Sequence, residues 1–147
     1  HHVVYLFPYC GKPWLTQKWT RRILDKAYGD DVRGLCGNDD VGQMSAWYVL
    51  SAIGLHPVAP GSGVWILTTP LFGRFAMPNA AGGTISVAAR DASDPGNVYI
   101  RSAMLNGKPL NRAWVTTREL NAPSGCRLEY ELGPGPNLSL FTEPPPR

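Results

Sequence analysis

Two adjacent carboxylates, Asp39 and Asp40, stand at the start of the segment GNDDVGQMSAWYVLSAIGLHP, residues 37–57. The apolar residues that follow recur at helical spacing, which predicts a helix that Gly54 ends. The face that this spacing defines consists of Met44, Trp47, Tyr48, Ser51, Ala52 and Leu55. We expect Asp40 to be the N-cap of this helix, with Gln43 as its partner in a capping box.

A carboxylate in this position can do chemistry. The first-turn amides and the helix dipole favour negative charge, so Asp40 is expected to stay ionised near neutral pH. An ionised carboxylate on a rigid element can serve as a general base or as a ligand of a hard cation. An aspartate before a helix is also commonly only a cap, and Asp-Asp beside an asparagine is common in turns. The spacing alone therefore leaves a catalytic role and a purely structural role open.

A second helix is expected before the acidic segment. It runs from Pro13 to Gly29, after the aromatic-rich residues 1–10 and a break at Gly11. Its expected apolar side consists of Trp14, Trp19, Ile23, Leu24, Ala27 and Tyr28. Trp14 can either stack on a sugar or belong to the core. Two helices joined by a short loop suit an antiparallel pair within a larger helical array, so we expect the missing partner surface to be an absent N-terminal portion.

The second half of the chain has the composition of short-stranded β structure. Glycine and proline, 16 and 14 residues in all, fall mostly after residue 56 and separate segments that alternate in polarity. The expected strands are 64–69, 72–77, 84–89, 98–105, 113–117 and 127–132. Asn106-Gly107 is a hairpin signal, across which 113–117 could pair back. The fold class expected is α+β, with a helical segment 1–57 followed by a small antiparallel β layer or sandwich over 58–147.

Charge and hydropathy argue against two kinds of partner. The net charge of +3 is weak and scattered, and its only basic cluster, Lys18, Arg21 and Arg22, is interpreted as a solvated helix face, so no nucleic acid is expected. No apolar run approaches the roughly 20 residues of a membrane span.

The three cysteines, Cys10, Cys36 and Cys126, have no metal-type spacing. Because their number is odd, a complete disulfide framework is not expected. We expect buried free thiols, with a Cys10–Cys36 bridge as the alternative in an oxidising compartment.

Two long segments carry a family resemblance. HHVVYLFPYCGKPW, residues 1–14, and GNDDVGQMSAWYVLSAIGLHPVAPGSG, residues 37–63, resemble glycoside hydrolase family 92, the calcium-dependent exo-α-mannosidases. Shorter agreements are TPLF at 69–72, YIRSAMLNGKP at 99–109 and LGPGPN at 132–137. The resemblance implies a larger two-domain enzyme with an N-terminal β-sandwich and an (α/α)6 barrel. Residues 1–57 would be the last helices of that barrel, and 58–147 its β-rich C-terminal region.

The resemblance also implies a reaction. Family members hydrolyse terminal α-mannosyl linkages of glycans with inversion, which requires one carboxylic acid to protonate the leaving oxygen and one carboxylate to activate water. The acid is expected upstream of this chain, and Asp40 matches the general base by its position. A second acidic residue found in some members is Asn38 here. Either Asp39 compensates for this departure, or Asn38 orients water or substrate hydroxyls.

The implied cofactor is calcium, with most of its ligands upstream and Asp40 contributing one contact, directly or through water. His1 and His2 match a paired-histidine segment of the family. They are expected either to donate hydrogen bonds to the sugar or to pack at the barrel end, and the resemblance argues against a tag remnant. Secretion or periplasmic export is expected from the family, and the isolated 147 residues are expected to be inactive.

Two other functions are compatible with the sequence. One is a non-catalytic module that binds carbohydrate or protein through its β half, where some of the five tryptophans would stack on sugar. Such a module should expose aromatic side chains on one sheet face, whereas a barrel segment should expose apolar helix faces. The other is a purely structural domain in which Asp40 only caps a helix.

Overall fold

The computed structural model describes residues 1–146. The helices are α1 (Pro13–Lys26), α2 (Gln43–Ile53) and the short α3 (Thr117–Leu120), with 3-10 turns η1 (Val3–Tyr5), η2 (Phe7–Cys10) and η3 (Asp40–Gly42). The strands are β1 (Leu55–His56), β2 (Val64–Leu67), β3 (Arg74–Pro78), β4 (Thr84–Arg90), β5 (Tyr99–Leu105), β6 (Lys108–Pro109), β7 (Trp114–Thr116) and β8 (Cys126–Gly133). The α+β class is confirmed, and every expected helix and strand forms within a few residues of its predicted bounds.

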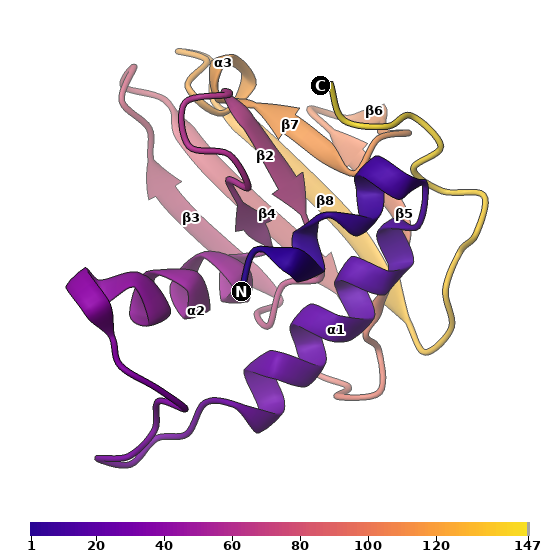
Figure 1. Cartoon of the computed structure of the whole chain (residues 1–147). Helices are drawn as coiled ribbons and strands as arrows, with labels where there is room; N and C mark the ends of the chain where they lie inside the picture. Colours follow the sequence, from indigo (N-terminus) through magenta and orange to yellow (C-terminus); the bar gives the residue numbers. More distant parts are fainter. Residues whose placement is uncertain (147) are drawn as a thin grey trace.

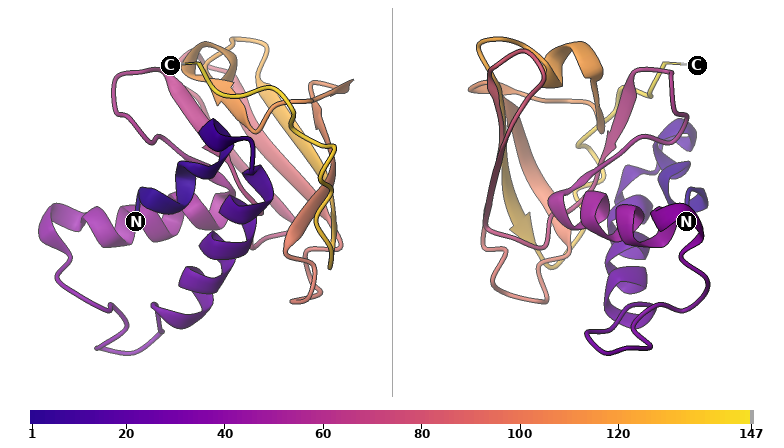
Figure 2. Two further views of the ribbon diagram at one scale, coloured as in Figure 1. Left: turned by 45° about the vertical axis from the view of Figure 1, so that its right-hand side comes forward. Right: turned by 90° about the vertical axis from the view of Figure 1, so that its left-hand side faces the viewer.

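The elements form three layers. A three-stranded sheet, in the order β1-β2-β7, lies between the helices and a five-stranded sheet (Figures 1 and 2). Val64 and Ile66 of β2 pack with Tyr5, Leu24 and Trp47 on the helical side. On the opposite face, Leu67 of β2 and Val115 of β7 share a second cluster with residues of the five-stranded sheet, which include Val87, Leu128 and Ile100. The small sheet is thus covered on both faces, because its strands alternate between two hydrophobic clusters.

The five-stranded sheet is mixed, which corrects the expectation of a purely antiparallel layer. Its order is β3-β4-β8-β5-β6, and β4 pairs with β8 in parallel, while the other pairs are antiparallel. Polarity alternation identifies a strand but not its neighbour, so the sequence did not show that β8 lies between β4 and β5.

The expected pairing of 113–117 across the Asn106-Gly107 turn is wrong. That turn joins β5 to the two-residue β6, and the hairpin ends near Pro109, which has no amide hydrogen to donate. The chain then crosses to the other sheet, where β7 pairs with β2. The turn at Asn106-Gly107 was therefore predicted correctly, but its partner strand was not: β5 pairs with β6 across it, and not with β7.

The side of α1 that packs inward is mostly polar, contrary to the expectation from its apolar residues. Its buried residues are Pro13, Thr16, Gln17, Thr20, Arg21 and Leu24. The carboxamide oxygen of Gln17 accepts a hydrogen bond from the amide of Ile100 at 3.0 Å, and Arg21 donates to the carbonyl oxygen of Pro70 at 3.2 Å. These side chains satisfy backbone groups of the β half that would otherwise be buried without partners.

The helical layer exposes apolar side chains. Val3, Leu6, Trp19 and Val49 are each at least about a third exposed. On the strands of the region 58–146, the exposed large hydrophobic side chains are Met77 and Met104, and neither is aromatic.

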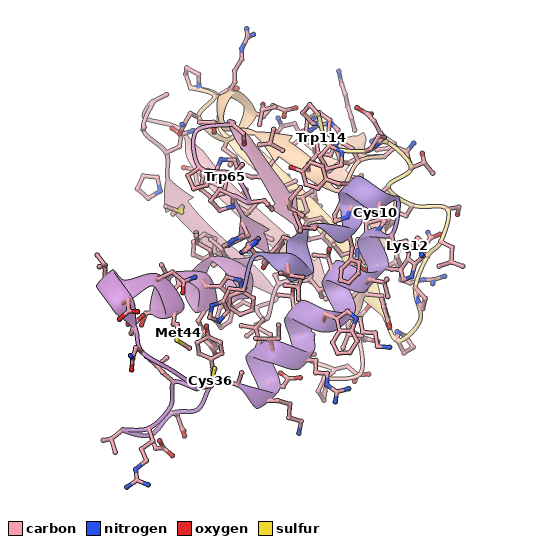
Figure 3. The ribbon with its side chains drawn as sticks, in the orientation of Figure 1. Cys10, Lys12, Cys36, Met44, Trp65 and Trp114 are labelled. Carbon is pink, nitrogen blue, oxygen red and sulfur yellow. The ribbon has the colours of Figure 1, made fainter. Side chains whose placement is uncertain are left out.

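The three cysteines are free thiols, but only Cys126 is buried. The expectation of burial is wrong for Cys10, which is exposed at the end of η2, and for Cys36, which is exposed on the loop after α1. They flank the two ends of α1 and lie far apart in Figure 3. Because α1 has 14 residues, about 20 Å long, the disulfide considered between them does not form.

The boundary at residue 57 divides the chain by composition, and the two parts pack closely. The strand β1 precedes that boundary but pairs with β2 beyond it. Both hydrophobic clusters contain residues from each part. No helix of the described residues is long and apolar enough to cross a membrane.

Candidate active site

The start of α2 is built by an unusual backbone path. Val41 has φ 55° and ψ 27°, and Gly42, which precedes the helix, has φ 77°. Two consecutive left-handed residues turn the chain back on itself. Glycine adopts this conformation easily, whereas a β-branched residue there is strained. This reversal of the backbone places the acidic segment at the N-terminal end of α2. That end of the helix lies away from the sheets (Figure 1).

Asp39, and not Asp40, caps α2. One carboxylate oxygen of Asp39 accepts hydrogen bonds from the amides of Met44 at 2.8 Å and Ser45 at 3.0 Å. Its other oxygen accepts the hydroxyl of Ser45. These bonds, first of all that from the Ser45 hydroxyl, hold the pKa of Asp39 below its usual value. The expected capping box of Asp40 and Gln43 is absent from the described residues, because the left-handed turn places the earlier carboxylate over the helix end.

Asp40 is exposed, and its carboxylate has no hydrogen-bond or ion-pair partner within residues 1–146. Asn38 is exposed as well. The structure therefore brings all three residues of the acidic segment to the N-terminal end of α2. The carboxylate of Asp40 remains available to water or to a ligand.

The loop before this segment is closed by its glycines. Tyr28 and Leu35 form an isolated antiparallel bridge, and the amide of Gly29 donates to the carbonyl oxygen of Gly34 at 2.8 Å. A Cβ atom on Gly34 would lie 2.2 Å from the carbonyl oxygen of Gly29. Only glycine fits this crossing, and the closed loop returns the chain to the end of α1 just before the acidic segment.

His1 is held against α2 by two aromatic residues. Its imidazole packs on the ring of Trp47 at 4.7 Å between centroids, and the Trp47 indole donates to the carbonyl oxygen of His1 at 3.2 Å. Its Nε2 atom lies 3.0 Å from the hydroxyl of Tyr28. The charge of Asp39 contributes to the raised pKa of Tyr28, after burial and Cys36. His1 and Asp39 therefore both lie close to Tyr28.

The other two residues expected to contact substrate lie elsewhere. His2 is exposed, and its charge adds to burial, the main cause, in lowering the pKa of His56. Trp14 is half-buried in the first turn of α1, whereas Tyr28 follows the last turn. The helix separates Trp14 from this site by about 20 Å, and its role in sugar binding stays a prediction.

The described residues do not by themselves form a metal site. No group of three or more His, Cys, Asp and Glu side chains within residues 1–146 could hold a metal ion. Within residues 38–40, the carboxylate without a hydrogen-bond partner is that of Asp40.

Sequence analysis missed the role of Tyr28, which had been assigned only to an apolar helix side. Its hydroxyl contacts both His1 and the carbonyl oxygen of Met44, and its ring stacks on Trp47 with an interplanar angle of 7°. Met44, Trp47 and Cys36 surround this contact, and the labelled Cys36 and Met44 lie together in Figure 3. The Tyr-Gly pair before the acidic loop is the signal that could have indicated it, because it marks where the loop closes.

Comparison with known proteins identifies the family of this chain. Residues 1–134 match the glycosyl hydrolase family 92 catalytic domain. An uncharacterized secreted glycosidase of Arthroderma benhamiae is 32% identical over 113 residues, which are 76% of this chain and 14% of the fungal protein. The chain thus spans about a seventh of the length of that relative.

Solved structures of the family match nearly the whole chain. A family 92 α-mannosidase from Bacteroides thetaiotaomicron, in complex with mannoimidazole, superposes with a TM-score of 0.91 at 35% identity, covering 99% of this chain and 19% of that one. The inverting family 92 mannosidase of the same organism gives a TM-score of 0.88 at 38% identity, covering 97% and 19%. The resemblance noted in residues 1–14 and 37–63 is confirmed, and the chain belongs to glycosyl hydrolase family 92.

Proposed function

We propose that this chain supplies the general base of an inverting exo-α-mannosidase that hydrolyses terminal α-mannosyl linkages of glycans, and that the base is Asp40. The observation that carries the proposal is the division of roles between the two aspartates. Asp39 makes the capping hydrogen bonds of α2, while the carboxylate of Asp40 is exposed beside it. Asp39 alone makes the hydrogen bonds that cap α2. Helix capping therefore does not explain the second carboxylate, Asp40.

Inversion assigns a defined task to Asp40. Its carboxylate accepts a proton from a water molecule as the water oxygen attacks the anomeric carbon from the face opposite the leaving group. A carboxylic acid, which the resemblance places outside this chain, protonates the leaving oxygen, and the two carboxyl groups of such an inverting pair lie about 6.5–9.5 Å apart. Asp39 is held at the helix end by Ser45, so it fixes the backbone next to the base. Asn38 is available to orient water or a substrate hydroxyl.

The substrate is inferred from the relatives. Two of the matching structures are described as mannosidases, one of them as inverting and another as bound to mannoimidazole. These descriptions concern those proteins. Since their identity to this chain is 35–38% over nearly its whole length, we extend the substrate class, mannose-containing glycans, to the enzyme that contains this chain.

The alternative of a non-catalytic β module is less well supported. Such a module should expose several aromatic rings on one sheet face, but the exposed large hydrophobic side chains on the described strands are the two methionines Met77 and Met104, and one exposed aromatic residue, Phe72, lies in the bend before β3. Trp65 and Trp114 are partly buried and pack against the two hydrophobic clusters. The tryptophans of the small sheet therefore serve packing.

Calcium and export belong to the same proposal. Calcium would supply electrostatic stabilisation of sugar hydroxyls, with Asp40 as the one carboxylate of this site able to reach it and its other ligands outside this chain. Secretion or periplasmic localisation is supported by the fungal relative, which is described as secreted. A chelator that abolishes mannose release by the full-length enzyme would support the calcium assignment.

Hydrolysis of mannobiose by the full-length enzyme tests the proposal. Replacing Asp40→Asn keeps the shape of the side chain and removes the base, so we expect kcat to fall at least about a hundredfold. The matched control is Asp30→Asn, which removes an exposed carboxylate from the preceding loop and should leave kcat unchanged. Proton NMR of the first product should show β-mannose, the inverted anomer.

Two results would overturn the proposal. A wild-type enzyme that releases no mannose from any α-mannoside would show that the substrate class is wrong. An Asp40→Asn enzyme with full activity would show that another group activates the water.

A further inference from the structure

The hydroxyl of Tyr28 stands between two polar atoms that come from distant parts of the chain. It lies 3.0 Å from the carbonyl oxygen of Met44 in α2 and 3.0 Å from Nε2 of His1. A carbonyl oxygen can only accept, so the hydroxyl donates its single proton to Met44. Towards His1 it can then only accept, which means that Nε2 carries the proton.

The state of Tyr28 is consistent with this assignment. Burial, with contributions from Cys36 and Asp39, raises the pKa of Tyr28 to about 12. The phenol therefore keeps its proton at any pH at which the enzyme would work, and the donor to Met44 is always present. A neutral His1 ring with its proton on Nε2 has an unprotonated Nδ1.

Trp47 holds His1 in place while Tyr28 fixes its proton. The indole binds the carbonyl oxygen of His1, and its ring packs on the imidazole. The rings of Trp47 and Tyr28 are themselves stacked at 5.8 Å. His1 is exposed, and its Nδ1 atom has no hydrogen-bond partner among residues 1–146. The imidazole is thus fixed at one edge and open at the other.

We propose that Tyr28 is a positioning residue of the glycosidase: it fixes the tautomer of His1 so that Nδ1 accepts a hydrogen bond from a mannose hydroxyl. This inference rests on the proposed function and adds the direction of the contact. The family resemblance predicted that His1 donates to the sugar, whereas a neutral His1 ring with its proton on Nε2 accepts at Nδ1. A hydroxyl that binds Nδ1 keeps its own oxygen free to accept from another group.

A double-mutant cycle on mannobiose hydrolysis by the full-length enzyme tests the inference. Tyr28→Phe removes the hydroxyl and keeps the ring that stacks on Trp47, so we expect KM to rise roughly threefold to tenfold, the value of one hydrogen bond, with a smaller change in kcat. In a His1→Ala background, Tyr28→Phe should have almost no further effect, because its effect passes through His1. The matched control is Tyr48→Phe, since the Tyr48 ring packs on Tyr28 but its hydroxyl has no hydrogen-bond partner among residues 1–146. This control should leave KM unchanged.

A second variant separates positioning from folding. His1→Gln can still donate an amide hydrogen to Tyr28, but it lacks an acceptor at the place of Nδ1. It should keep the melting temperature of wild type and still raise KM. Equal effects of Tyr28→Phe in both backgrounds, or a His1→Gln enzyme with wild-type KM, would refute the role of Tyr28. Both results require an active wild-type mannosidase, so they are distinguishable from a failure of the proposed function.

Discussion

Asp39 and Asp40 are neighbours in sequence with the same side chain, and the fold gives them different surroundings. The residue that follows them is Val41, whose left-handed conformation begins the turn into α2. For a β-branched side chain this conformation is strained by about 1–2 kcal/mol. Strained residues of this kind cluster at functional sites, where the surrounding structure holds them in place.

Val41→Asn should raise the free energy of unfolding by about 1 kcal/mol, because asparagine tolerates the left-handed region that valine resists. The control is Val32→Asn, since Val32 is equally exposed but has no positive φ. Thermal unfolding of the full-length enzyme measures both variants. An unchanged melting temperature for Val41→Asn would mean that the strain is absent.

The loop of residues 28–35 is the element that brings the acidic segment back beside α1. It is closed where Gly34 crosses Gly29, with no room for a Cβ atom. The neighbouring Gly37 differs, because a Cβ there would lie 3.6 Å from the sulfur of Met44, an ordinary contact. The two glycines therefore offer a matched pair for testing how the loop positions the site.

Gly34→Ala should destabilise the enzyme by about 1–3 kcal/mol and lower kcat/KM on mannobiose, because backbone atoms at the crossing must move and shift the segment that carries Asp40. Gly37→Ala should change neither quantity appreciably. Thermal unfolding and steady-state kinetics of both variants measure the difference. Equal behaviour of the two variants would show that the loop crossing does not position the base.

The helical and β parts are joined across the whole molecule by a shared core, and His56 lies at their junction. Its ring stacks on Tyr5 of η1 at 4.3 Å between centroids, while β1, to which it belongs, pairs with β2. Burial is the main cause that lowers the pKa of His56 from 6.5 to about 4, and the charge of His2 acts in the same direction. The folded state therefore binds fewer protons than the unfolded state between these values, and stability falls as the pH decreases through this range.

His56→Phe should flatten this dependence, since phenylalanine can stack on Tyr5 but cannot take up a proton. Melting temperatures of the full-length enzyme at several pH values from 7 to 4 give the comparison. We expect the wild type to lose more stability than the variant between pH 6.5 and pH 4. Parallel curves would show that His56 does not titrate differently in the folded enzyme.

Sequence reasoning found most elements of the fold and the segment that carries the candidate base, because helical periodicity, strand alternation and turn residues are local signals. It did not find which strands are neighbours, because pairing depends on residues far apart in the chain. It assigned the cap to Asp40 because a left-handed valine was not expected. It also overlooked the polar inward face of α1, where Gln17 and Arg21 serve backbone groups of the β half.

The position of β8 has a consequence for how the molecule assembles. It is the last strand to be synthesised, yet it lies between β4 and β5 and bonds to both. The β3–β4 and β5–β6 hairpins can form early, but they have no edge in common until residues 126–133 insert between them. On the ribosome, the five-stranded sheet must therefore wait for the end of this region to emerge. Until then, the strand edges that β8 will cover are open to pairing with other chains.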